Sequence, residues 1–230
     1  MIKINFPLLI VFCFLVSSEL VFADRQPLPA SRLEQLSGVR SDDSKQKWDK
    51  KFSSRSYVYG KSPAKFLAEN YHYIPFGASV RDMGMGEGRN AVFLAQKGYK
   101  VTGVDISSVA VKKSLALAKE FGVQINTVVA SLNKYKIPEG TFDAIICFYY
   151  VDRSLIEKMK SWLKPGGVII FEAYTIDQKN SDSNLKADDP SYYLKKQELL
   201  HLFPEMRILK FEEPIHEKEY RSSLIVRKKG

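Results

Sequence analysis

Cysteine and histidine are scarce in this sequence. Of the two cysteines, Cys13 lies in an apolar N-terminal run, so a chain processed beyond that run keeps only Cys147 and can form no internal disulfide. The three histidines, His72, His201 and His216, lie far apart along the chain. No spacing typical of zinc ligands is present, and we therefore expect no metal site.

Long apolar segments are also missing. The run from Phe6 to Val16 is too short for an ordinary membrane span, and Glu19 interrupts its extension. Lys3 precedes this run and Val21-Phe22-Ala23 follows it, a pattern typical of a signal peptide cleaved after Ala23. We therefore expect an exported protein, periplasmic or secreted. The alternative is a protein that is anchored in the membrane by this segment, left uncleaved.

Acidic residues are outnumbered, with 26 Asp and Glu against 35 Lys and Arg, which gives a net charge of +9. This balance favours anionic partners. The basic residues are scattered, however, so we interpret them as a solvated surface and expect no nucleic-acid partner. The short run Arg227-Lys228-Lys229 is interpreted as a frayed tail. Nothing in the sequence indicates an oligomeric state.

Three regions follow from composition. Residues 1–23 are the predicted signal peptide, residues 24–44 a linker or flexible arm, and residues 45–230 one domain. Within that domain, apolar segments predict an alternation of strands and helices. The predicted strands are residues 78–83, 101–106, 125–130, 142–148 and 168–173, followed by a pair at 208–214 and 220–226 that we expect to be antiparallel. We expect an α/β fold with a single Rossmann-like, doubly wound, mostly parallel sheet and a C-terminal antiparallel strand pair.

Helix and loop signals complete this outline. Helices are predicted at residues 89–97, at 107–120 with Ser107 as N-cap, at 153–163 and at 194–202. Ser62-Pro63 predicts the start of another helix. The stretch Lys164-Pro165-Gly166-Gly167 predicts a turn, and the polar segment from Thr175 to Ser191 predicts a surface loop over the site.

A glycine-rich loop follows the first predicted strand. Asp82 is followed by Gly84, Gly86 and Gly88, spaced G-x-G-x-G. A dinucleotide site needs G-x-G-x-x-G so that the helix start can meet a pyrophosphate. The shorter spacing suits a ligand without phosphate, whose amino-acid portion lies across the loop and whose ammonium group meets Asp82. Asp105, at the end of the second strand, can accept hydrogen bonds from both ribose hydroxyls.

From about Trp48 onward the chain resembles class I S-adenosylmethionine-dependent methyltransferases. The closest likeness is to the small bacterial group related to tellurite-resistance methyltransferases. The matching segments are WDKKF, YVYGKSPAKFL, DMGMGEGRNAVFLAQKGYKVTGVDIS, FDAII, LKPGGVIIFEAYT and the final strand pair. The resemblance implies that S-adenosylmethionine is the cofactor, bound by the glycine loop, Asp82 and Asp105. After the third strand the family usually holds the adenine amino group with an acidic residue. Ser131 stands there in this chain and can accept that bond more weakly.

The resemblance also implies methyl transfer to a small-molecule acceptor. We expect a soft or anionic acceptor, a thiol or a reduced chalcogen, because such a nucleophile needs little acid–base help. Candidate catalytic residues are Tyr149 and Tyr150 after the fourth strand and Glu172 near the end of the fifth. Arg221 is a further candidate, for neutralising an anionic acceptor.

Three other functions remain open. A non-catalytic S-adenosylmethionine-binding protein is the main alternative, because export removes the chain from a cytoplasmic cofactor. An NAD-dependent oxidoreductase is disfavoured by the glycine spacing. A nucleic-acid amino-methyltransferase is disfavoured because no acidic-Pro-Pro-aromatic segment follows the fourth strand, where flipped bases are held.

Overall fold

The computed structural model describes residues 43–182, 184, 189–214 and 219–230. The predicted signal peptide and most of the predicted arm therefore lie outside the described residues. The first described element, helix α2 (Asp43–Phe52), begins two residues before the predicted start of the domain at residue 45. Within the described ranges, none of the helices combines the length and the apolar character that a bilayer-spanning helix needs.

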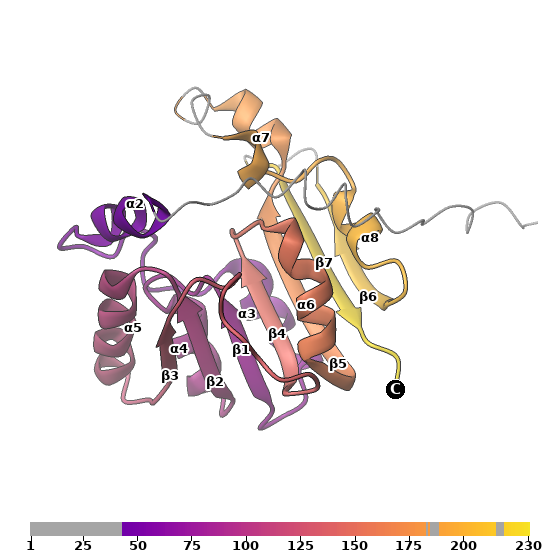
Figure 1. Ribbon diagram of the computed structural model, residues 1–230, viewed down its shortest axis with the longest axis horizontal. Coiled ribbons are helices and arrows are strands. Elements are labelled where there is room, and N and C mark those ends of the chain that lie inside the picture. The colour runs from indigo at the N-terminus through magenta and orange to yellow at the C-terminus, as the bar shows by residue number, and fades with distance from the viewer. Residues whose placement is uncertain (1–42, 183, 185–188, 215–218) are drawn as a thin grey trace, which may run out of the picture.

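The core of the fold is a seven-stranded sheet with the order β3-β2-β1-β4-β5-β7-β6 (Figure 1). The strands are β1 (Ser79–Met83), β2 (Lys100–Asp105), β3 (Asn126–Val129), β4 (Phe142–Phe148), β5 (Leu163–Tyr174), β6 (Arg207–Glu212) and β7 (Arg221–Arg227). Strands β1 to β5 pair in parallel, and β7 runs antiparallel between β5 and β6. The predicted fold class, including the antiparallel C-terminal pair, is confirmed.

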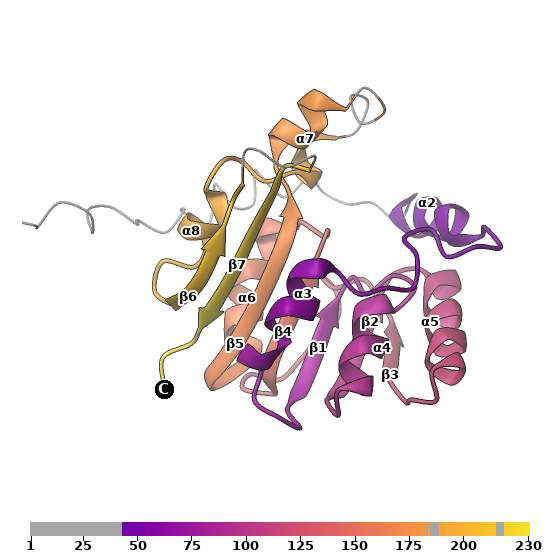
Figure 2. The same ribbon diagram turned by 180° about the vertical axis from the view of Figure 1, so that it is seen from behind.

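Helices cover both faces of the sheet. Helices α6 (Ile156–Trp162) and α8 (Glu198–Leu202) lie on the face seen in Figure 1. Helices α3 (Lys65–Asn70) and α4 (Arg89–Gln96) lie on the opposite face, seen in Figure 2, and α5 (Ser108–Glu120) packs beside β2 and β3. Successive strand residues point to opposite faces, so Ile145 and Ile146 of β4 belong to two separate apolar clusters. This two-sided burial explains why the strands are almost continuously apolar.

Additional elements lie beyond the C-terminal ends of the strands. Figure 1 shows α2 and α7 (Ile176–Ser181) at this edge, and a short 3-10 helix, η4 (Pro190–Tyr192), follows α7 in the chain. The Lys47 ammonium of α2 lies 4.9 Å from the centre of the Tyr192 ring, so these distant segments meet above the sheet. The segment from Thr175 to Ser191, predicted as a surface loop, contains helix α7, and η4 begins at its end.

Two predicted helices begin later than their sequence signals indicate. Helix α3 begins at Lys65 rather than after Ser62, because Ala64 adopts an extended conformation and its N–H donates to Asn90 Oδ1 at 2.9 Å. The helix predicted at residues 194–202 is reduced to α8, because Leu194 forms a parallel bridge with Thr175 and Gln197 takes a positive φ of 56°.

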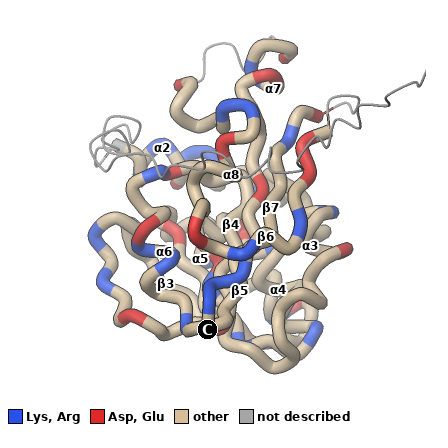
Figure 3. Tube along the Cα trace, turned by 90° about the vertical axis from the view of Figure 1, so that its right-hand side faces the viewer, with Lys and Arg blue, Asp and Glu red and all other residues tan. Residues whose placement is uncertain are grey.

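The remaining differences concern β5, α6 and the C-terminus. The predicted turn at residues 164–167 is part of β5, with a register shift against β4. The helix predicted at 153–163 divides into a 3-10 turn, η2 (Arg153–Leu155), and α6. The C-terminal basic run (Figure 3) is not frayed. Lys228 Nζ donates to the carbonyl oxygens of Lys160 and Leu163 at 2.7 and 2.8 Å.

Candidate functional site

The glycine loop joins β1 to α4 at the C-terminal edge of the sheet. Gly84, Gly86 and Gly88 have φ values of 64°, 56° and 85°, which favour glycine. Gly84 and Gly86 keep part of their surface exposed, whereas Gly88 is buried. A Cβ atom on Gly88 would lie 2.5 Å from Ser114 Cβ, so this glycine allows α4 and α5 to approach closely. Gly84 and Gly86 are thus the glycines available to a ligand.

Asp82 is the next-to-last residue of β1, and the loop follows two positions later. Its side chain is buried, with 2% exposed, and Oδ2 has no hydrogen-bond partner among the described residues. Burial, reinforced by the nearby Asp105 carboxylate, raises the pKa of Asp82 to about 7. A buried acceptor without a partner is costly, and a cationic group placed there would satisfy it. The structure therefore fits the predicted contact with the ammonium group of a ligand.

Asp105 connects the end of β2 to the loop. Gly86 N–H donates to its Oδ2 and Ser107 N–H to its Oδ1, both at 2.8 Å. Burial raises the pKa of this carboxyl, while the two backbone donors act in the opposite direction. Each carboxylate oxygen retains a further lone pair. Asp105 therefore orders the loop and can still accept hydroxyl groups, as a bidentate ribose contact requires.

Helix α2 lies against the other side of the same loop. Asp49 accepts hydrogen bonds from Ser107 Oγ at 2.6 Å and from Val109 N–H at 3.2 Å, and so caps the N-terminus of α5. Phe52 is buried, and its ring comes within 3.5 Å of a Cβ position on Gly86. Lys113 Nζ donates to the carbonyl oxygen of Phe52 at 3.3 Å. Sequence reasoning missed Asp49, since no local pattern links an α2 carboxylate to the start of α5.

The two adjacent tyrosines after β4 point to different layers. Tyr149 packs with the α3–α4 layer and Tyr150 with the α6–α8 layer. Tyr149 has a φ of 57°, unusual for a bulky residue and worth about 1–3 kcal/mol of strain. The Tyr150 ring lies 3.0 Å from a Cβ position on Gly84, so this tyrosine borders the glycine loop.

Tyr149 belongs to a buried polar cluster at the ends of β4, β5 and β7. Its Oη donates to Glu172 Oε1 at 2.7 Å, and Ser223 Oγ donates to Glu172 Oε2 at 2.8 Å. Arg221 Nη1 lies 3.8 Å from Glu172 Oε1. Burial and the Glu172 carboxylate raise the pKa of the Tyr149 phenol, which is therefore protonated at neutral pH. The Arg89 guanidinium, beside the glycine loop, lies 5.6 Å from the centre of the Tyr149 ring.

A second polar cluster joins the segments after β3 and β4. Asn133 Nδ2 donates to Asp152 Oδ2 at 2.9 Å, and Ser154 N–H and Oγ donate to Asp152 Oδ1 at 3.1 and 2.6 Å. The predicted adenine contact Ser131 is half-buried at the start of the first segment. Asn133 and Asp152 carried no sequence signal, because their two segments are separated by the whole of β4.

Within the described part of the chain, no three His, Cys, Asp or Glu side chains come close enough together to hold a metal ion. The groups gathered at this edge are instead a buried carboxylate, a carboxylate with spare acceptors and backbone at glycines. These groups match the ammonium and ribose of S-adenosylmethionine.

Comparison with known proteins agrees with this geometry. Residues 80–167, from β1 into β5, match the family model described as a methyltransferase domain. A ubiquinone biosynthesis O-methyltransferase of Xanthomonas axonopodis pv. citri is 33% identical over 103 residues, 42% of this chain and 43% of that protein. The same enzyme of Chromobacterium violaceum is 27% identical over 139 residues, 58% of this chain and 60% of that protein. The chain thus matches about half the length of these relatives.

A solved structure supports the fold. TehB from Haemophilus influenzae is 20% identical, with a TM-score of 0.59 over 80% of this chain and 67% of that one. The matched segment, residues 80–167, thus resembles a methyltransferase domain, and the strand order around it is that of the predicted α/β fold. The predicted cofactor is thereby supported.

Proposed function

We propose that the protein transfers the methyl group of S-adenosylmethionine to a small-molecule acceptor that carries an acidic or anionic group. The carrying observation is the Tyr149–Glu172 pair beside Arg221, which places a hydrogen-bonding and cationic cluster next to the glycine loop. The described residues form one domain, which suits a small acceptor. The likeness to the tellurite-resistance-related group is part of this proposal.

The chain's own residues have three tasks in this reaction. Bound S-adenosylmethionine supplies an activated methyl group on a sulfonium leaving group. Asp82, Gly84, Gly86 and Asp105 hold the cofactor by its ammonium group and ribose. The Arg221 guanidinium attracts and orients an anionic acceptor. Where the acceptor enters protonated, Glu172 can receive its proton through the hydroxyl of Tyr149.

Two acceptor chemistries are compatible with this cluster. A thiolate or reduced chalcogen needs only orientation and charge neutralisation. An acidic hydroxyl such as a phenol needs a proton acceptor, which the Tyr149–Glu172 pair offers. The curated relatives are named O-methyltransferases, and this name favours testing the hydroxyl acceptors beside the sulfur and selenium ones.

A turnover assay over an acceptor panel tests the proposal. The protein from residue 24 onward is incubated with S-adenosylmethionine and thiols, selenide or phenols, and S-adenosylhomocysteine formation is measured. Tyr149→Phe should lower kcat on hydroxyl acceptors about tenfold or more and leave cofactor affinity unchanged. Tyr99→Phe is the control, since the Tyr99 hydroxyl donates to Ile74 O in the core. Tight cofactor binding without turnover of any acceptor would favour the non-catalytic binding protein.

A further inference from the structure

We infer that Asp152 recognises the amino group of the cofactor's adenine, the role that the family resemblance implies for residue 131. This inference rests on the proposed function, because it concerns the cofactor of that reaction. It is carried by the polar cluster of Asn133, Asp152 and Ser154, together with the position of Tyr150.

The cluster spans the part of the sheet where a nucleoside must lie. Strands β3 and β4 are not neighbours, since β2 and β1 lie between them. The Asn133–Asp152 hydrogen bond and the contact of Ser154 Oγ with Asn133 Oδ1 at 3.1 Å therefore connect segments across the C-terminal ends of β1 and β2. Asp105 ends β2, which pairs in parallel with β3, so the base of a ribose held there can extend toward the end of β3.

Asp152 is also linked to the glycine loop. The Tyr150 ring packs against Gly84, and its hydroxyl lies 3.5 Å from Asp152 Oδ2. Asp152 is thus connected to the glycine loop through Tyr150 and to the segment after β3 through Asn133. An adenine base that lies between the glycine loop and the segment after β3 would have its polar edge next to the Asp152 carboxylate.

The acceptor capacity of Asp152 suits an amino donor. Its Oδ1 already accepts two hydrogen bonds from Ser154, whereas Oδ2 accepts one close bond from Asn133 and a long one from Tyr150. A donor can therefore be added at Oδ2. Asp152 as a residue is only 9% exposed, so a carbonyl group placed opposite its carboxylate would leave two acceptors facing each other away from water.

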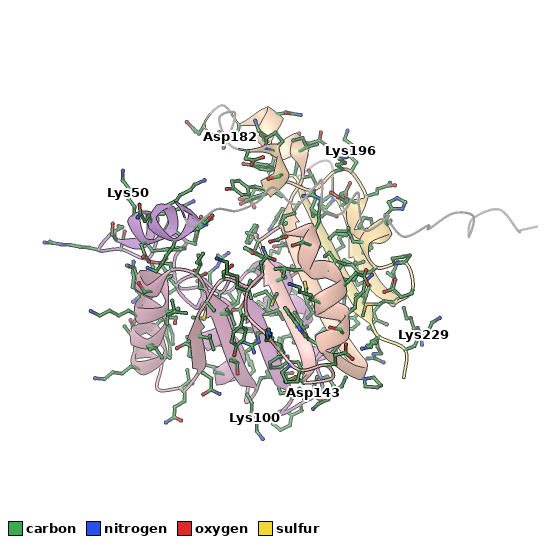
Figure 4. All side chains as sticks on the ribbon, viewed as in Figure 1. Lys50, Lys100, Asp143, Asp182, Lys196 and Lys229 are labelled. Carbon is green, nitrogen blue, oxygen red and sulfur yellow. The ribbon has the colours of Figure 1, made fainter. Side chains whose placement is uncertain are left out.

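No other carboxylate of this region competes for the role. Between residues 130 and 154 the remaining acids are Glu139 and Asp143. Asp143 lies at the edge of the sheet opposite α7 (Figure 4) and is bound to Lys164 Nζ at 2.8 Å and to Ser79 Oγ at 2.6 Å. Glu139 is exposed in the segment leading into β4. A neutral Ser131 hydroxyl accepts more weakly than a carboxylate.

Calorimetric titration with S-adenosylhomocysteine and its inosine counterpart tests the assignment. The two ligands differ at the base, which carries an amino donor in the first and a carbonyl acceptor in the second. The wild-type protein should prefer adenine by about tenfold or more. Asp152→Asn should lose or reverse this preference, because its amide can donate to the carbonyl while Oδ1 still caps η2. Ser131→Ala should retain the wild-type preference.

The outcomes separate the inference from the function on which it rests. If Asp152→Asn does not fold, Asp152→Ser replaces it, since serine also caps a helix start, and it should lose the preference as well. Retention of the adenine preference in the Asp152 variants, or its loss in Ser131→Ala alone, overturns the assignment. A wild-type protein that binds neither ligand refutes the proposed function and the inference with it.

Discussion

The substitution Asp82→Asn should stabilise the ligand-free protein and abolish the pH dependence of cofactor binding. Asp82 is buried, lacks a partner at Oδ2 and has a pKa raised from 3.8 to about 7. Because the folded-state pKa lies above the unfolded one, this residue contributes stability that is present below about pH 4 and is lost as the pH rises to about 7. This rise in the pKa of Asp82 lowers the free energy of unfolding by about 4 kcal/mol once the pH is above about 7. Asparagine has nearly the same shape and does not titrate.

The measurement is thermal unfolding of both proteins without ligand between pH 4 and pH 8. The melting temperatures should coincide near pH 4 and diverge to about 8–16 °C in favour of the variant at pH 8, since about 1 kcal/mol shifts Tm by about 2–4 °C at this domain size. Asp143→Asn is a matched control that should change the melting temperature in the opposite direction. The partners Lys164 and Ser79 outweigh burial and lower the pKa of Asp143 to about 2, so its loss should destabilise the protein above pH 4.

Cofactor binding provides the second readout of the same residue. The ammonium group requires ionised Asp82, so wild-type affinity for S-adenosylhomocysteine should rise from pH 5 to about pH 7 and then level off. The Asp82→Asn variant should bind about 10–100-fold more weakly at pH 8, with little pH dependence over this range. Equal melting temperatures for variant and wild type at pH 8 would refute the argument from burial.

Three further predictions concern the loop, the ribose contact and the N-terminus. Asp105→Ala should weaken S-adenosylmethionine binding by about 1–3 kcal/mol in calorimetry, and unchanged affinity would contradict the ribose assignment. Gly88→Ala should cost about 2–4 kcal/mol in chemical denaturation, because its Cβ would meet Ser114, whereas Gly122→Ala, with φ of 67° and nothing within 4 Å, should cost about 1 kcal/mol. Protein isolated from its native host should begin at Asp24, and recovery of an intact Met1 would argue against signal cleavage.

Much of the fold could be predicted because its signals are local. The apolar strands, the Ser107 cap and the loop from Asp82 to Gly88 each depend on residues within a few positions of one another. The predictions failed where a distant contact opposes a local preference. Asn90 holds Ala64 extended and delays α3, and the Thr175–Leu194 bridge shortens α8.

The same division holds for the candidate site. The sequence by itself determined the glycine loop and the acid at the end of β2, because a strand, a turn and the next strand carry these groups in a fixed order. Only the tertiary structure decided that Tyr149 and Tyr150 serve different layers, that Asp49 lies 58 residues from its partner Ser107, and that Asp152 meets Asn133. These contacts depend on how the sheet brings strand ends together, and that arrangement has no counterpart in residue spacing.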